Sequence, residues 1–166
     1  AIMKKAVFMS ENKAAIPNAY AESLRAEMAE VFEFLPDVYT LKDESEDRAA
    51  LADVEVIFST WGMPRLDEEQ IKSILPNLKA VFYGAGSVQY FARPYMACGV
   101  EIFSAWAANA VPVAEYTFAQ ITLAAKGYFQ AEKYYHILPV RSLAFANSST
   151  GNFGCKVGLV GLGAIG

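Results

Sequence analysis

The sequence predicts an α/β fold built around a parallel sheet. Short apolar runs rich in β-branched and aromatic residues alternate, almost without exception, with segments whose apolar residues recur at helical spacing. The connections between these segments are short, and such alternation is typical of a parallel sheet with helices on both faces. Hydrophobic residues make up 54% of the 166 positions, which is ample for a packed core.

Five strands are expected in the first two thirds of the chain. Each is an apolar run that ends at polar or glycine residues, as buried strands do. They are KAVFMS at 5–10, DVYTL at 37–41, VEVIFST at 54–60, KAVFYGAG at 79–86 and GVEIFSA at 99–105. A last strand, KVGLVG, is expected at 156–161.

The segments between the strands are predicted to be helices. Apolar residues at helical spacing and intervening glutamates indicate an amphipathic helix over 19–34. Shorter helices are expected at 46–53, 67–75 and 89–97, and the segment 142–154 is expected to be a loop. The longest helix is predicted over 109–135, with Asn109 as its N-cap and Pro112 in its first turn, where a missing N–H costs least.

Together these elements predict three divisions of the chain. Residues 3–105 would form a flavodoxin-like, doubly wound domain. Residues 106–137 would form a long helix that bridges two domains or forms a subunit interface, with packing inside one domain as the alternative. Residues 138–166 would contain a loop and the start of a second domain. Ligands of doubly wound sheets sit beyond the carboxyl ends of the strands, so the candidate segments are 10–13, 59–64, 84–89 and 104–109.

Composition and charge exclude several functions. The formal charge of −4 is spread over interspersed acidic and basic residues, which argues against a nucleic-acid surface. A zinc site needs about four Cys or His ligands, and Cys98, Cys155 and His136 are the only ones, so no metal is expected. Buried, reduced thiols in a cytoplasmic protein are favoured over a disulfide. The most apolar long stretch, 107–123, holds too many polar residues for a membrane span.

A glycine-bearing turn follows the fourth expected strand. Gly84, Ala85, Gly86 and Ser87 would expose successive backbone N–H groups at the carboxyl edge of the sheet, and such turns bind anions. The alternative is a plain strand-to-helix turn, in which glycine is needed only because it can adopt a positive φ. His136 has no carboxylate near it in the sequence, and we expect it to be an ordinary surface histidine. The chain therefore offers binding surfaces but no evident catalytic residue.

The final residues, KVGLVGLGAIG, match a nucleotide-binding pattern. Gly161, Gly163 and Gly166 have the spacing G-x-G-x-x-G after an expected strand. In that pattern the glycines permit a tight turn, approach to a pyrophosphate and close packing of the next helix. Neither that helix nor the acidic residue about 20 positions later lies within the sequence. Glycine-rich turns are common, so the motif alone leaves cofactor binding open.

The order of these features resembles the D-isomer-specific 2-hydroxyacid dehydrogenases, the family of D-lactate, phosphoglycerate and glycerate dehydrogenases. Asn109, Val113, Ala114 and Glu115 meet the family pattern Asn-x-x-x-Val-Ala-Glu. The C-terminal residues meet the pattern G-x-x-V-G-L-V-G-L-G-x-I-G. The resemblance spans the whole chain and is strong from about residue 76 onward.

The resemblance implies a substrate domain and a Rossmann domain with the active site between them. The chain would be the N-terminal part of an NAD- or NADP-dependent enzyme that interconverts a D-2-hydroxy acid and a 2-keto acid. Ala85 and Gly86 would offer N–H groups to the substrate carboxylate, with Ser87 bordering the loop. Asn109 would approach the nicotinamide. The residues expected to pass under the pyrophosphate are Gly161, Gly163, Ala164, Ile165 and Gly166.

The family's catalytic arginine, glutamate and histidine match no position here, so this piece is expected to be inactive by itself. The resemblance also implies a homodimer to which the linking helix contributes. The family often has an aspartate in its Gly-x-Gly-x-Asp loop, where this chain has Val88, which leaves the substrate open.

Two other classes of protein remain as alternatives. One is a stand-alone flavodoxin-like binding or regulatory module. However, the segment 10–17 lacks the glycine of a flavodoxin phosphate loop, and Ser59 and Thr60 stand where a phospho-receiver has aspartate. The other is a non-enzymatic, NAD-sensing relative.

Overall fold

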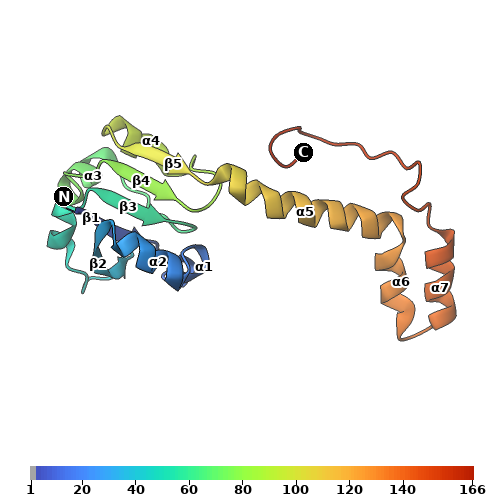
Figure 1. Cartoon of the computed structure of the whole chain (residues 1–166). Coiled ribbons are helices and arrows are strands. Elements are labelled where there is room, and N and C mark those ends of the chain that lie inside the picture. Colours follow the sequence, from blue (N-terminus) through green and yellow to red (C-terminus); the bar gives the residue numbers. More distant parts are fainter. Residues whose placement is uncertain (1–2) are drawn as a thin grey trace. The chain divides into compact units, whose positions relative to one another are not determined.

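The first of two compact units contains the predicted sheet. The computed structural model describes residues 3–166, and the chain divides into units Ala1–Asn109 and Ala110–Gly166. In the described part of the first unit, five parallel strands are ordered β2-β1-β3-β4-β5, the flavodoxin-like order (Figure 1). The strands are β1 Lys4–Met9, β2 Phe32–Tyr39, β3 Val56–Ser59, β4 Ala80–Tyr83 and β5 Glu101–Ser104. The predicted fold class is therefore confirmed.

Helices cover both faces of this sheet. Helices α1 (Ala15–Ala19) and α2 (Glu22–Ala29) lie on one face, where Ile16 and Tyr20 pack against Phe8 and Phe58. The other face is covered by a 3-10 helix η1 (Arg48–Asp53) with α3 (Glu68–Ile74) and α4 (Ala92–Ala97). Neighbouring residues along each strand point to opposite faces, so β1 and β3 supply both clusters of the core.

A row of aromatic rings crosses all five strands on the face of α1 and α2. Neighbouring ring centroids are 4.7 to 6.0 Å apart. The row runs through Phe34, Phe8, Phe58, Phe82 and Phe103. Phe103 is 46% exposed, so the row ends at the surface on β5. An apolar groove lies there, lined by Leu24 and Met28 of α2 and by Phe82 and Phe103.

The helix predicted over 19–34 is wrong in its second half. Helix α2 ends at Ala29, and β2 begins at Phe32, five residues earlier than predicted. Phe32 and Phe34 alternate onto the aromatic face, and Phe34 stacks on Phe8 at 4.7 Å. The position of Phe32 fits the period of a helix and that of a strand equally well. The pairing with β1 makes this segment a strand. Pro36 is tolerated because β2 is an edge strand. The pairing of β2 with β1 also shifts in register at this point, opposite the step from Ala6 to Phe8 in β1.

The long helix predicted over 109–135 is broken in the structure. Helix α5 (Trp106–Ala125) ends before Gly127, which takes φ +70° and caps α6 (Tyr128–Tyr135). A Cβ at residue 127 would lie 2.9 Å from the carbonyl oxygen of Phe145, so only glycine fits there. The predicted N-cap is also wrong, because α5 begins at Trp106 and contains both Asn109 and Pro112.

Part of the predicted loop at 142–154 is helical. Helix α7 (Pro139–Ser148) begins with proline in its first turn, a position that suits proline. It packs against α6, where Phe145 stacks on Tyr134 with ring centroids 5.5 Å apart and Arg141 lies 4.4 Å above the same ring. The Ser- and Asn-rich composition suggested a loop, but these contacts with α6 stabilise a helix.

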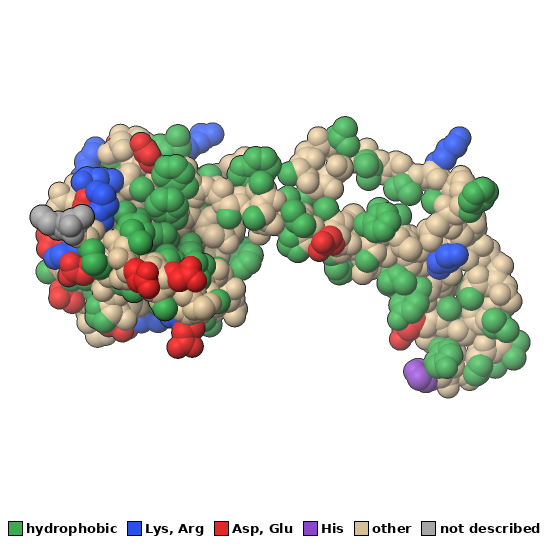
Figure 2. All heavy atoms as spheres, in the orientation of Figure 1, with side chains coloured by type: hydrophobic (Ala, Val, Ile, Leu, Met, Phe, Trp, Pro, Cys, Tyr) green, Lys and Arg blue, Asp and Glu red, His purple; other side chains and the backbone are tan. Residues whose placement is uncertain are grey.

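The strand predicted at 156–161 is not formed. A strand needs a neighbour for its backbone groups, and within residues 3–166 this segment has none. Its apolar side chains are exposed, as are many of those on α5, α6 and α7, which Figure 2 shows as green surface. The glycines that follow still form a turn, in which Gly161 takes φ +91° and Gly166 lies against the Gly161 carbonyl.

Candidate anion-binding site at the carboxyl edge of the sheet

The loops after β1 and β3 are fastened together where the strand order reverses. The Ser10 hydroxyl donates to the carbonyl of Trp61 at 2.8 Å and accepts from the N–H of Asn12 at 3.0 Å. The N–H of Glu11 donates to the carbonyl of Gly62 at 2.7 Å. Gly62 has φ +90°, and a Cβ there would lie 2.9 Å from the Ser10 hydroxyl. This close approach fixes both loops at the edge where doubly wound sheets bind ligands.

Tyr20 fastens the ends of β3 and β4. Its hydroxyl donates to the carbonyls of Ser59 at 2.8 Å and Phe82 at 3.2 Å, and burial raises its pKa to about 12. The N–H of Gly84 also donates to Ser59, at 2.8 Å. A Cβ at residue 84 would lie 3.1 Å from the Tyr20 hydroxyl, so glycine leaves room for this contact.

The loop from Gly84 to Ser87 leaves three consecutive N–H groups open. Within residues 3–166, the N–H groups of Ala85, Gly86 and Ser87 have no protein acceptor. Ala85 is buried, Gly86 is half-buried and Ser87 is exposed. The carbonyl oxygens of this loop do have a partner. The Ser104 hydroxyl lies 2.5 Å from the Gly86 carbonyl and 3.2 Å from the Ala85 carbonyl. Unpaired N–H groups in such a turn suit an anion such as a carboxylate.

The structure brings two of the predicted site residues together. The amide nitrogen of Asn109 lies 3.1 Å from where a Cβ of Gly86 would be. Asn109 stands in the first turns of α5, where its own N–H donates to the Ala105 carbonyl at 2.9 Å. Gly86 thus has no room for a side chain, and its backbone is accessible beside the Asn109 amide.

Aromatic and basic side chains lie in the segments that follow β3, β4 and β5. Trp61 and Trp106, which follow β3 and β5, are 57% and 60% exposed. Arg65 lies 5.2 Å above the ring of Tyr90. The pKa of Tyr90 is raised, first by burial and then by the neighbouring Tyr83 hydroxyl.

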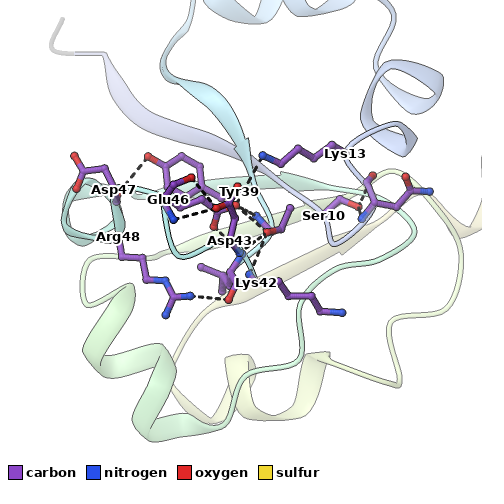
Figure 3. A network of polar contacts seen from close by, with 12 residues as sticks. Ser10, Lys13, Tyr39, Lys42, Asp43, Glu46, Asp47 and Arg48 are labelled. Carbon is purple, nitrogen blue, oxygen red and sulfur yellow. Dashed lines mark hydrogen bonds and ion pairs between the residues drawn. The ribbon is translucent and has the colours of Figure 1, made fainter.

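The carboxyl end of β2 is held by a buried carboxylate. Glu46 accepts from the N–H and hydroxyl of Thr40 at 2.7 and 2.8 Å and from the N–H of Leu41 at 2.8 Å (Figure 3). Arg48 donates to the Leu41 carbonyl at 2.8 Å. These contacts hold Leu41 at φ +61°, which costs a non-glycine residue free energy. They shape the edge of the sheet at the end of β2.

The remaining predicted residues lie in the second unit. Gly161, Gly163, Ala164, Ile165 and Gly166 are exposed. A Cβ at Gly163 would meet no atom within 4 Å, so its backbone is open to approach. His136 is exposed. Both cysteines are free, but neither is fully buried as predicted, since Cys98 is half-buried and Cys155 is exposed.

The part of the chain that the structure describes holds neither a metal cluster nor a membrane-spanning helix. No group of three His, Cys, Asp or Glu within 3–166 could hold a metal ion. In the same range, no helix combines the length and apolar character needed to cross a bilayer.

Reasoning from sequence missed two residues that hold this site together. Ser104 fell within the candidate segment 104–109 but carried no distinguishing signal. Tyr20 lies outside every candidate segment, and only the fold reveals that its hydroxyl reaches two strand ends. Gly84, by contrast, belongs to the glycine-bearing turn that the sequence predicts.

Comparison with solved structures identifies proteins that share this fold. A phosphoglycerate oxidoreductase from Rhizobium etli matches 98% of this chain at 17% identity, with a TM-score of 0.64 and 49% of its own chain covered. An NADPH-dependent glyoxylate/hydroxypyruvate reductase from Sinorhizobium meliloti, solved with NADP and malonate, matches 98% at 16% identity, with a TM-score of 0.62 and 47% covered. A glyoxylate reductase from Paecilomyes thermophila matches 99% at 15% identity, with a TM-score of 0.60 and 50% covered.

The chain has the fold of these oxidoreductases. It spans about half the length of each of these solved structures. These proteins are oxidoreductases or reductases by name, which is the class of enzyme that the sequence motifs resemble. No protein-family model matches the sequence, and no curated protein matches it.

Proposed function

We propose that this chain supplies the substrate-binding part of an NAD(P)-dependent D-2-hydroxyacid dehydrogenase. Such an enzyme is an oxidoreductase that moves hydride between a nicotinamide and the second carbon of a small hydroxy or keto acid. The observation that carries the proposal is the loop Gly84–Ser87, whose open N–H groups lie beside Asn109 at the carboxyl edge of the sheet. The motif around Asn109 and the fold of the matched oxidoreductases support it further.

In this proposal the loop binds the carboxylate common to both forms of the substrate. The N–H groups of Ala85 and Gly86 donate to it, and Ser87 borders the loop. Asn109 stands on the side from which the nicotinamide approaches. Backbone donors are suited to this task because they are fixed in place and need no reorganisation when the anion binds.

The cofactor is proposed to be NAD or NADP, whose nicotinamide accepts or donates the hydride. Its pyrophosphate would lie against Gly161, Gly163, Ala164, Ile165 and Gly166. The open backbone at Gly163 fits that task. Holding it tightly also needs the N-terminus of a helix after the turn, and within residues 3–166 no helix follows it.

The carboxylate site is tested by titrating the ¹⁵N-labelled chain with oxamate, an unreactive analogue of a 2-keto acid. The backbone amide signals of residues 85–87 are expected to shift together and to saturate. Gly86→Ala, which places a Cβ against the Asn109 amide, is expected to weaken binding at least fivefold. Gly158→Ala is the matched control, because a Cβ there meets no atom within 4 Å. Wild-type amide signals that do not move with oxamate would contradict the proposal.

The 166-residue chain alone is expected to show no turnover. The family's catalytic arginine, glutamate and histidine match none of its positions. Adding NADH and a panel of 2-keto acids should leave the NADH absorbance constant. Oxidation of NADH that depends on the keto acid would overturn this expectation.

We also propose that the protein forms a homodimer through its second unit and resides in the cytoplasm. The support for a dimer is the apolar surface of α5 and α6, which includes Val111, Tyr116, Phe118, Tyr128 and Phe129 (Figure 2). Surfaces of this kind commonly mark a protein interface. The support for the cytoplasm is that Cys98 and Cys155 are both free thiols.

A further inference from the structure

The Gly84–Ser87 loop is anchored to the neighbouring strand by one side chain. Ser104, the last residue of β5, brings its hydroxyl to 2.5 Å from the Gly86 carbonyl oxygen and 3.2 Å from that of Ala85. β5 is paired in parallel with β4, with Tyr83 opposite Ser104, so the hydroxyl lies beside the first residues after β4. No other side chain in residues 3–166 bonds to these two carbonyls.

The two carbonyls determine where two N–H groups point. A peptide unit is planar and trans, so the C=O of one residue and the N–H of the next point in opposite directions. The carbonyls of Ala85 and Gly86 point toward Ser104. The N–H groups of Gly86 and Ser87 therefore point away from it, and both lack a protein acceptor within the described chain.

We propose that Ser104 is a positioning residue that directs the N–H groups of Gly86 and Ser87 toward the substrate carboxylate. This inference rests on the proposed function of the loop. It also gives Ser87 a second role, because its backbone N–H donates to the carboxylate while the residue borders the loop.

The rest of the loop needs this anchor. Gly84 is held at one end by its bond to Ser59, and a Cβ added at Gly84 or Gly86 would lie 3.1 Å from the Tyr20 hydroxyl or the Asn109 amide, respectively. The peptide units between these points can still rotate, because glycine at 86 offers little steric resistance. A rotated peptide would present a carbonyl oxygen where an N–H had been, and that oxygen repels a carboxylate. The hydroxyl of Ser104 favours the orientation that binds.

The test compares oxamate binding by the wild-type chain with binding by Ser104→Ala. We expect Ser104→Ala to bind oxamate about fivefold more weakly, the effect of one neutral hydrogen bond. The amide signals of Gly86 and Ser87 should change before ligand is added, and those of Glu11 and Asn12 should not. Ser104→Thr, which keeps the hydroxyl, is expected to restore binding to within twofold of wild type. Ser73→Ala, an exposed serine on α3, is the matched control.

Each outcome separates the inference from the proposed function. Equal oxamate affinity in wild type and Ser104→Ala overturns the positioning role and leaves the carboxylate site standing. Failure of the wild-type chain to bind oxamate overturns the carboxylate site and the inference with it. Weak binding by both Ser104→Ala and Ser104→Thr overturns the inference, because the hydroxyl then does not matter. If Ser104→Ala does not fold, Ser104→Cys replaces it, since a thiol of similar size is a poor donor.

Discussion

At the scale of single residues, the carboxyl edge is made of backbone groups that a few hydroxyls hold in place. Ser10 joins the loops after β1 and β3, Tyr20 joins the ends of β3 and β4, and Ser104 joins β5 to the Gly84 loop. Each of these side chains bonds to at least one carbonyl oxygen. Within residues 3–166, the N–H groups of Ala85, Gly86 and Ser87 have no protein acceptor and are open to a ligand.

Tyr20→Phe is expected to lower the free energy of unfolding by about 1–2 kcal/mol, because it removes the buried hydroxyl bonds to Ser59 and Phe82. Urea denaturation measures the difference. Tyr116→Phe is the control, since Tyr116 is 66% exposed and its change should be close to zero. A Tyr20→Phe protein as stable as wild type would show that this hydroxyl does not stabilise the edge.

The same substitution should change how stability depends on pH. Burial raises the pKa of Tyr20 from 10.0 to about 12, so the folded state retains the proton longer than the unfolded state does. The contribution is fully present below about pH 10 and is lost as the pH rises toward about 12. Wild type should therefore lose stability more steeply than Tyr20→Phe over that range. Tyr90 and Tyr95, whose pKa values are also raised, are common to both proteins and cancel in the comparison.

Two glycines with similar φ angles allow the cost of backbone strain to be distinguished from the cost of steric contact. Gly62 and Gly99 have φ +90° and +82°, but only at Gly62 does a Cβ meet other atoms, with the Ser10 hydroxyl at 2.9 Å. Gly62→Ala should therefore destabilise the protein by about 1–2 kcal/mol more than Gly99→Ala. Thermal or urea unfolding of both variants measures the difference. Equal losses would mean that the loops after β1 and β3 adjust freely to the added methyl group.

At the scale of elements, the glycine at the break between α5 and α6 lies close to α7, which forms a helical hairpin with α6. Gly127 turns the chain with φ +70°, and α7 then packs along α6. An added Cβ at 127 would lie 2.9 Å from the Phe145 carbonyl, which belongs to α7. One glycine therefore lies both at the end of α5 and next to the backbone of α7.

Gly127→Ala is expected to destabilise this hairpin by about 2 kcal/mol or more, since it combines backbone strain with a contact to rigid backbone. Gly154→Ala is the matched control, with φ +68° and no atom within 4 Å of its Cβ. Hydrogen exchange of the α6 and α7 amides measures local opening. Similar exchange in the two variants would show that the contact with Phe145 is dispensable.

Elements whose local pattern agreed with their final contacts could be predicted from the sequence. Helix α3 is an example, because Asp67 and Gln70 form the capping box that begins it. β2 was misassigned because Phe32 satisfies two periods, and its pairing with β1 lies far away in the sequence. Gly86 and Asn109 were both predicted as site residues, but nothing in the sequence showed that they lie side by side. Hydroxyl anchors such as Tyr20 depend on distances between strand ends and cannot be read from a pattern.

At the scale of the whole molecule, the two units differ in how they cover their apolar residues. The first unit buries a two-sided core around the sheet. In the second unit, Phe118 and Val140 are 73% and 79% exposed. An isolated helical hairpin with so much apolar surface gains stability when a partner covers it.

The proposed homodimer can be tested on this surface. Phe118→Glu places a charge on the exposed face of α5 and should raise the dimer dissociation constant at least tenfold. Gln89→Glu adds the same charge to an exposed position of the first unit and should leave it unchanged. Sedimentation equilibrium measures both constants. A wild-type chain that is monomeric at all concentrations would rule out a dimer formed by this chain alone.

The positions of the two tryptophans have a consequence for spectroscopy. Trp61 and Trp106 are the only ones in the chain, and both are largely exposed at the carboxyl edge of the sheet. The tryptophan emission of the chain therefore originates at this edge and not in the core. Emission at long wavelength is expected from the folded protein. Its quenching by a dissolved ligand would then report events at this edge without any attached dye.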